Sequence, residues 1–151
     1  MSDLRRLLEE KKGFFISFDM FTEMKEALNE TFASGAIVIL AIMAKRCGEK
    51  TFKEIVEKAK VKEEALNKLC KIFAERNWGE LSFINVNLKE GRGKGIVKNS
   101  FEARNHKSAV PCCHFLSNFM TGFLAKLFQK EIRVTEIKCA GKGDPYCEFD
   151  F

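Results

Sequence analysis

The sequence lacks several features that would assign a function class directly. Its 151 residues contain no apolar run longer than residues 36–44, which is far too short to span a bilayer. The N-terminus shows no basic region followed by a long apolar stretch and a small-residue cleavage site, so we expect a cytoplasmic protein without membrane insertion. Repeats, low-complexity tracts and linkers are missing as well. We therefore expect a single domain over residues 1–151.

Side chains suited to catalysis are also scarce. The sequence has only two histidines, one tryptophan and one tyrosine. It shows no Ser/His/Asp order and no nucleotide fingerprint that would bind a reductant. A binding role is therefore a better prediction than an enzyme, and a reductase would need electrons from a partner or a bound cofactor. The six cysteines are expected to be free thiols or metal ligands, because disulfides are rare in a reducing compartment.

Charge does not indicate a nucleic-acid partner. The 26 basic and 21 acidic residues give a net charge of +5, and both signs are interleaved along the chain. Such interleaving is typical of a solvated surface. No long basic stripe with interspersed aromatic residues is present, so nucleic-acid binding is not expected.

Helical periodicity dominates the first half of the chain. Residues 20–31 repeat apolar side chains at helical spacing, which predicts an amphipathic helix. Residues 34–46 are apolar on nearly every face, so we expect a helix buried on most sides at the centre of the core. Thr51 and Glu54 form a capping box that predicts the start of a new helix. A further helix follows Val61.

The second half reads mainly as strands. Two strands are expected on either side of a glycine-rich turn at residues 91–95, and a helix should begin at Pro111. Residues 132–139 and 146–151 then predict a C-terminal hairpin. The fold class expected is α+β, with N-terminal helices packed on an antiparallel sheet, a C-terminal helix and a β-hairpin.

Four residues have the spacing of a metal site. Cys139 and Cys147 flank seven residues, so a hairpin places their sulfurs nearly opposite each other. Cys113 lies in the first turn of the expected helix, where a thiolate is favoured. Glu136 is three positions before Cys139, on the opposite face of an ideal strand, so both can ligate only if a bulge or the strand end rotates one of them. Three sulfurs and a carboxylate suit Zn²⁺, although iron or cobalt could occupy the same ligands. Four protein ligands leave no open position, so the metal would be structural.

The spacing leaves alternatives open. Cys112 lies beside Cys113, and periodicity does not choose between them. All of these cysteines also fit a simpler interpretation as small buried apolar residues. His114 is a further candidate ligand, although a single histidine beside an apolar stripe is more often a packing residue.

The C-terminal half resembles the 4-vinyl reductase domain family. The resemblance is carried by residues 99–103, 113–115, 136–139 and 143–149, and it is specific from about Trp78 onward. That family is named for proteins linked to vinyl-group reduction on bacteriochlorophyll precursors. The same domain is the aromatic-sensing module of bacterial activators that respond to phenols and xylenes. Its fold is related to haem nitric-oxide-binding domains and to TRAPP subunits.

The resemblance implies a ligand set and a mode of action. In the phenol sensors a Cys, a Glu and two further Cys hold zinc, and these positions correspond to Cys113, Glu136, Cys139 and Cys147. A homodimer is implied as well. The sensors also carry a DNA-binding domain and an ATPase, whereas this sequence ends at Phe151. Any signalling is therefore expected to pass through a separate partner protein; the alternative is a protein that simply binds or carries its ligand.

A ligand pocket is the last prediction from the resemblance. The sequence contains 15 phenylalanines, which would suit an aromatic or otherwise hydrophobic ligand, although core packing explains any single one of them. The sensory pocket should lie beside the zinc-bearing helix and hairpin. The candidate pocket residues are Phe101, His106, Phe115, Phe119 and Phe123.

We therefore expect a zinc-stabilised binding or sensor module for a small hydrophobic ligand that is aromatic, hydrocarbon or tetrapyrrole-like. One alternative is a reductase, or an accessory protein, acting on a vinyl group of a tetrapyrrole. The other is a winged-helix DNA-binding regulator built from residues 51–78 and the strands through Val97. Glu63 and Glu64 argue against that second alternative, because they would face phosphate at the start of the recognition helix.

Overall fold

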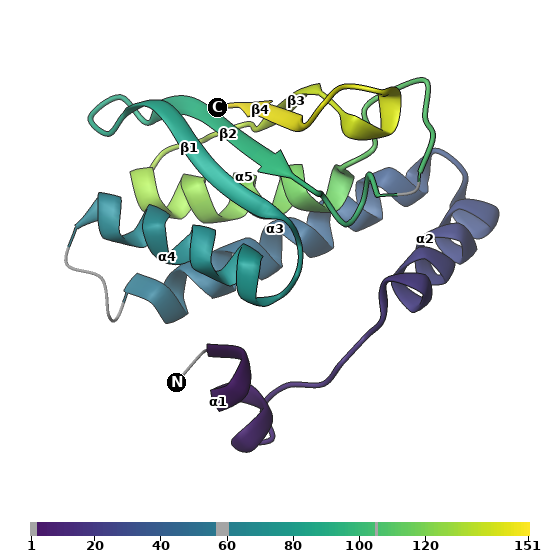
Figure 1. Cartoon of the computed structure of the whole chain (residues 1–151), viewed down its shortest axis with the longest axis horizontal. Coiled ribbons are helices and arrows are strands. Elements are labelled where there is room, and N and C mark those ends of the chain that lie inside the picture. Colours follow the sequence, from purple (N-terminus) through teal and green to yellow (C-terminus); the bar gives the residue numbers. More distant parts are fainter. Residues whose placement is uncertain (1–2, 57–60, 105) are drawn as a thin grey trace.

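A four-stranded antiparallel sheet lies over helix α5, and the long helix α3 crosses beneath α5 (Figure 1). A computed structural model describes residues 3–56, 61–104 and 106–151. In these ranges the elements are α1 (Asp3–Glu9), α2 (Phe18–Phe32), α3 (Gly35–Val56), α4 (Lys62–Glu75), β1 (Glu80–Asn87), β2 (Arg92–Lys98), α5 (His114–Phe128), β3 (Thr135–Lys138), the 3₁₀ helix η1 (Ala140–Lys142) and β4 (Cys147–Asp150). The α+β class, the antiparallel sheet and the C-terminal hairpin are confirmed.

The strands follow the order β1-β2-β4-β3, and every neighbouring pair is antiparallel. The first hairpin turns earlier than expected, because β2 already begins at Arg92. The expected turn at residues 91–95 is therefore wrong in position. Only Gly91, with a φ of 62°, supplies the left-handed conformation of the turn, whereas Gly93 lies inside β2. A Cβ on Gly93 would come within 3.1 Å of the Val86 backbone, so this glycine permits close packing.

Helix α5 is the centre of the hydrophobic core. Its apolar residues recur on all faces, and Leu116, Phe119, Phe123 and Leu124 are at most 1% exposed. The sheet covers one side of α5 and α3 covers the other, so no face is left for solvent along most of its length. The helix that sequence periodicity placed at the centre, residues 34–46, is instead the layer outside it.

Helices α3 and α5 touch backbone to backbone at two glycines. A Cβ built on Gly48 of α3 would lie 2.0 Å from the Phe119 carbonyl oxygen of α5. Conversely, a Cβ on Gly122 of α5 would lie 2.0 Å from the Lys45 carbonyl oxygen. Each glycine therefore gives the other helix the room it needs. This crossing fixes the position of α5, which also carries part of the candidate site.

Two expectations about α3 are wrong. The helix runs without a break through Thr51, which is buried in its interior, so the capping box starts no new helix there. Burial on most sides is also contradicted, because Val38 is 59% and Ile42 is 57% exposed. Packing against α5 covers a single face of α3, and the opposite apolar face is uncovered in this chain.

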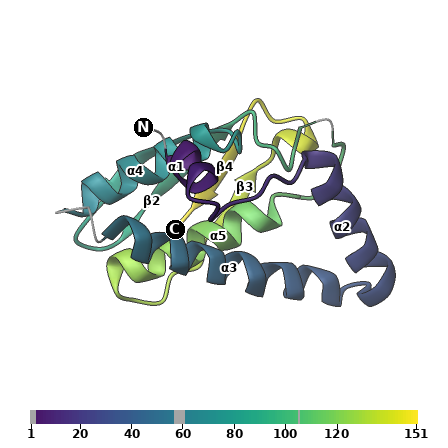
Figure 2. The same ribbon diagram turned by 90° about the horizontal axis from the view of Figure 1, so that it is seen from below.

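The N-terminal helices lie at the periphery. Helix α2 packs against the start of α3 at one end of the molecule, and it contains no fully buried residue (Figure 2). The sequence did not predict α1, which contacts α4. Between α1 and α2, Phe14 and Phe15 are each 83% exposed. None of the described helices combines the length and hydropathy that crossing a membrane requires.

Candidate metal centre and adjacent cavity

Four side chains from separate elements converge at one end of the sheet. Cys113 is the N-cap of α5, Glu136 belongs to β3, Cys139 precedes η1, and Cys147 begins β4. Their ligand atoms, three Sγ and one carboxylate oxygen, all lie within 4.8 Å of one another. Cys113, Cys139 and Cys147 are completely buried. This cluster can hold a metal ion.

An irregularity in the hairpin makes this convergence possible. Glu136 pairs with Phe149, but Lys138 pairs with Glu148, so the register shifts between the two pairs. A bulge of this kind inserts an extra residue and changes the face on which the following side chains lie. The bulge, one of the two solutions that the spacing of Glu136 and Cys139 allowed, is therefore present.

Of the two adjacent cysteines before α5, only Cys113 belongs to the cluster of four. The Sγ of Cys113 lies 3.6 Å from that of Cys147. The Sγ of Cys112 lies 3.5 Å from that of Cys139 but falls outside the group of mutually close ligand atoms. Pro111 does not start the helix as expected, since α5 begins at His114. The N-cap position directs the Cys113 side chain towards the hairpin.

Hydrogen bonds hold the cluster in this arrangement. The amide of Cys113 donates to Glu136 Oε2 over 2.9 Å, and the amide of Ala140 donates to Cys147 Sγ over 3.3 Å. The Ser100 hydroxyl lies 3.3 Å from Cys113 Sγ. Such outer contacts orient the ligand side chains.

One unsatisfied polar atom indicates that the cluster fits a metal. Glu136 Oε1 is buried and has no hydrogen-bond partner among the described residues, although a buried polar atom normally has one. The thiols also crowd one another: the neighbouring sulfurs of Cys112 and Cys147 raise the pKa of Cys113, and burial raises the pKa of Cys139 to about 12. A hydrogen bond from Cys113 lowers the pKa of Cys147. A bound cation would interact with the unpartnered carboxylate oxygen of Glu136 and hold the sulfurs as thiolates.

A cavity of about 750 Å³ lies next to the cluster. One face of α2, the start of α3 and the segment that leads into α5 surround it. Phe18, Phe21 and Phe101 provide aromatic walls, with ring centroids 5.3 Å apart for both the Phe18–Phe101 and the Phe21–Phe101 pairs. Cys112 lines the cavity and also contacts Cys139. Cys112 therefore connects the cavity to the sulfur cluster.

The predicted pocket residues fall into three places. Phe101 and His106 line the cavity. Phe115 does not line it, but its ring packs 5.5 Å from that of Phe21 and 6.1 Å from that of Phe101. Phe119 and Phe123 are buried in the core between α5 and its neighbours. The assignment of these five residues to a ligand pocket remains a prediction.

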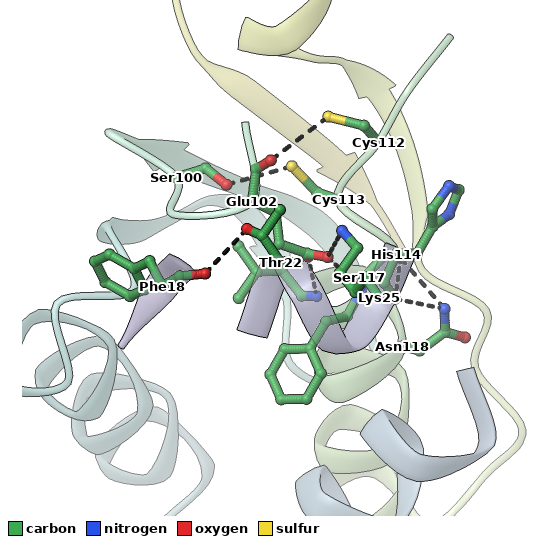
Figure 3. A network of polar contacts seen from close by, with 12 residues as sticks. Phe18, Thr22, Lys25, Ser100, Glu102, Cys112, Cys113, His114, Ser117 and Asn118 are labelled. Carbon is green, nitrogen blue, oxygen red and sulfur yellow. Dashed lines mark hydrogen bonds and ion pairs between the residues drawn. The ribbon is translucent and has the colours of Figure 1, made fainter. Parts of the chain in front are cut away.

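Sequence reasoning missed the charged residues of the cavity. Lys25 of α2 forms an ion pair with Glu102, with 3.2 Å between Nζ and Oε1 (Figure 3). The only signal in the sequence was a lysine on the apolar stripe of a helix, four residues after Phe21 and three before Leu28. His114 also lines the cavity, and burial lowers its pKa, which favours the neutral imidazole.

The fold and the site together define a class of protein. It is an α+β domain in which a C-terminal hairpin and the start of a helix meet at a thiol-rich cluster beside an aromatic cavity. Residues 96–151 match the model of the 4-vinyl reductase domain. The resemblance of the C-terminal part of the chain to the 4-vinyl reductase domain family is therefore confirmed.

Related sequences come from Methanocaldococcus jannaschii, where three proteins described as uncharacterized match parts of the chain. One is 39% identical over 56 residues, which are 36% of this chain and 25% of that protein. A second is 27% identical over 103 residues, which are 68% of this chain and 58% of that protein. The third is 27% identical over 84 residues, which are 50% of this chain and 52% of that protein. The chain thus spans between a quarter and three fifths of these relatives.

Two crystal structures share the fold. The phenol-responsive sensory domain of the transcription activator PoxR, solved with phenol, superposes with a TM-score of 0.82 at 17% identity, over 91% of this chain and 75% of that one. A vinyl-4-reductase family protein from Methanocaldococcus jannaschii superposes with a TM-score of 0.54 at 23% identity, over 91% of this chain and 96% of that one. At these identities the likeness shows a common fold.

Proposed function

We propose that the protein is a zinc-stabilised, single-domain binding or sensor module for a small hydrophobic ligand. The observation that carries the proposal is the contact between the two halves of the site, since Cys112 lines the aromatic cavity and touches Cys139 of the metal cluster. A cavity of this volume with aromatic walls suits a small, mainly apolar molecule. The fold shared with a phenol-responsive sensory domain supports the same assignment.

The proposed metal is Zn²⁺, bound by Cys113, Glu136, Cys139 and Cys147. Three thiolates and a carboxylate form a tetrahedral set that zinc favours, and four protein ligands mark a structural site. The role of the ion is to join the start of α5 to the hairpin of β3 and β4. Free energy of metal binding then contributes directly to folding, because the unfolded chain has no preformed site.

Elemental analysis and native mass spectrometry of the purified protein test this proposal. We expect about one zinc per chain and a Cys147→Ser variant that loses the metal and melts on the order of 10 °C lower. Cys47→Ser is the matched control, because Cys47 is an exposed cysteine on α3. An unchanged metal content in Cys147→Ser would remove that residue from the ligand set.

Protein from its native host, analysed by native mass spectrometry, tests the ligand class. A co-purified aromatic, hydrocarbon or tetrapyrrole-like molecule supports the binding module. Turnover of a vinyl substrate with a supplied reductant would favour the reductase alternative instead. The winged-helix alternative has little support, because β2 pairs with β4 within the four-stranded sheet and the hairpin is no free wing.

We further propose that the module is a cytoplasmic homodimer that signals through a partner protein. Its six free thiols suit a reducing compartment. The outer face of α3 exposes Val38, Ile42 and Met43, an apolar surface of the kind that subunit interfaces cover. Sedimentation velocity tests the dimer: Ile42→Glu should yield monomers, whereas Ile84→Glu on β1 should not. A wild-type chain that sediments as a monomer at micromolar concentration contradicts the proposal.

A further inference from the structure

Two cationic side chains among the described residues line the cavity, Arg104 and Lys25, and Lys25 is the one that α2 supplies. Lys25 follows Phe21 by four residues and precedes Leu28 by three, so all three side chains lie on the same face of the helix. The Lys25 side chain is only 25% exposed, and its Nζ lies 5.8 Å from the centre of the Phe21 ring. A lysine in this position loses much of its hydration and requires other partners.

Glu102 is the partner that the protein supplies, and its own hydrogen-bonding capacity is largely used. Its side chain is fully buried. Oε1 accepts hydrogen bonds from the amide of Phe115 over 3.0 Å and from Lys25, and Oε2 accepts one from the amide of Leu116 over 2.8 Å. Both amides belong to the first turn of α5, where a carboxylate is stabilised by the helix dipole. Glu102 is thus fixed to α5, and it holds the Lys25 amine in place (Figure 3).

Lys25 keeps donors that the protein does not use. An ammonium group carries three N–H donors. Within the parts of the chain that the structure describes, Glu102 Oε1 is the one acceptor that Lys25 Nζ contacts. Two donors therefore remain, on a group that borders a cavity of about 750 Å³ with aromatic walls. An oxygen atom of a bound molecule would satisfy them.

We propose that Lys25 is the residue that recognises the polar group of the ligand, and that the ligand is an uncharged, mainly apolar molecule with an acceptor oxygen. This inference rests on the proposed binding function and names the ligand chemistry of that site. The pair of Lys25 and Glu102 is neutral overall, and the charge of Arg104, which also lines the cavity, is outweighed by the three acidic residues of α2 there. The site therefore offers donors without a net positive charge. A carboxylate ligand would be repelled by Glu102 and by the acidic residues of α2 at the cavity, Asp19, Glu23 and Glu26.

Three small probes test the proposal by calorimetry or ligand-observed NMR. Acetophenone and α-methylstyrene have nearly the same shape, but only acetophenone carries an acceptor oxygen, and benzoate adds a negative charge. We expect the wild-type chain to bind acetophenone at least about tenfold more tightly than α-methylstyrene, because a hydrogen bond to a charged group is involved. Benzoate should bind more weakly than acetophenone. In Lys25→Met the preference for acetophenone should disappear, while α-methylstyrene keeps its affinity.

Lys50→Met is the matched control, since it removes one positive charge from an exposed ion pair on α3. It should keep the wild-type preference. If Lys25→Met does not fold, because Glu102 is left buried without its cation, the double variant Lys25→Met/Glu102→Gln removes both charges and is judged by the same criterion.

The outcomes separate this inference from the proposed function. A preference for acetophenone that persists without Lys25 overturns the inference, and so does a wild-type chain that binds acetophenone and α-methylstyrene equally well. In both cases the hydrophobic binding function stands. A wild-type chain that binds none of the three probes contradicts the inference and the binding function together.

Discussion

The backbone amide of Cys113, at the start of α5, is hydrogen-bonded to the carboxylate of Glu136 on β3. The amide donates to Glu136 Oε2 over 2.9 Å, while Glu136 Oε1 is buried without a partner among the described residues. One oxygen therefore fixes the side chain, and the other is left for the ion that the cluster can hold. This division of roles is what a carboxylate ligand requires, because its orientation is set before the ion binds.

Glu136→Gln tests this relationship. The amide oxygen of glutamine can still accept the hydrogen bond from Cys113, but it is a poor metal ligand. We expect the affinity for zinc to fall by at least about tenfold in competition with a chelator. Glu131→Gln makes the same change of charge at an exposed position just before β3 and should leave the affinity unchanged. Equal chelator midpoints for both variants would show that Glu136 is no ligand.

Glu102 predicts a pH dependence of stability. Burial raises the pKa of Glu102 above its ordinary value, although Lys25 and the amides of Leu116 and Phe115 oppose the shift. The folded chain therefore binds more protons than the unfolded chain above about pH 4.5. Stability from this group is fully present below that pH and is lost as pH rises through the folded pKa.

The measurement is the melting temperature of the wild type and of Glu102→Gln between pH 5 and pH 8, with metal content checked at each pH. Glutamine does not titrate, so the advantage of the wild type over Glu102→Gln should shrink as pH rises. Glu30→Gln, at an exposed position on α2, is the control and should show a constant difference from the wild type. A constant difference for Glu102→Gln as well would contradict the raised pKa.

The cluster was largely predictable because its determinants are local. The seven residues between Cys139 and Cys147 define a hairpin, and the spacing of Glu136 and Cys139 required either a strand end or a bulge such as the register shift provides. The charged pair in the cavity was not predicted from the sequence. Lys25 and Glu102 are 77 positions apart, and only the packing of α2 brings them together.

Helix α3 shows where sequence reasoning about the fold was wrong. Its continuous apolar sequence predicted burial, but Val38 and Ile42 are exposed because an apolar run does not specify which faces of a helix its neighbours cover. The helix also continues through Thr51, where a capping box predicted a start. A local cap signal is outweighed here by the long contact between α3 and α5.

Gly48→Ala should destabilise the fold. The new Cβ would lie 2.0 Å from the Phe119 carbonyl oxygen, so α3 and α5 would have to move apart. Overpacking of this kind costs about 1–3 kcal/mol, and it should exceed the gain of about 1 kcal/mol in helix propensity. Gly35→Ala is the control, because its Cβ would have ordinary contacts, with Phe32 at 3.8 Å. Urea denaturation should show a lower midpoint for Gly48→Ala alone, and equal midpoints would contradict the close crossing.

Trp78 should report on the cavity by its fluorescence. It is the single tryptophan of the chain, and its ring centroid lies 6.2 Å from that of Phe101, which lines the cavity. A ligand that displaces the Phe101 ring changes the packing around the indole, so emission should shift on binding. Cyclohexyl methyl ether is a suitable probe, because it carries an acceptor oxygen and does not absorb at the excitation wavelength.

Phe101→Leu should abolish most of this fluorescence response, because leucine keeps an apolar wall but has no ring in contact with Trp78. Phe83→Leu is the matched control, since Phe83 packs against Phe151 on the sheet, with 5.9 Å between the ring centroids, and does not line the cavity. This control should keep the wild-type response. An unchanged response in Phe101→Leu would mean that the probe reaches Trp78 by another route, and the position of the ligand beside Phe101 would then be wrong.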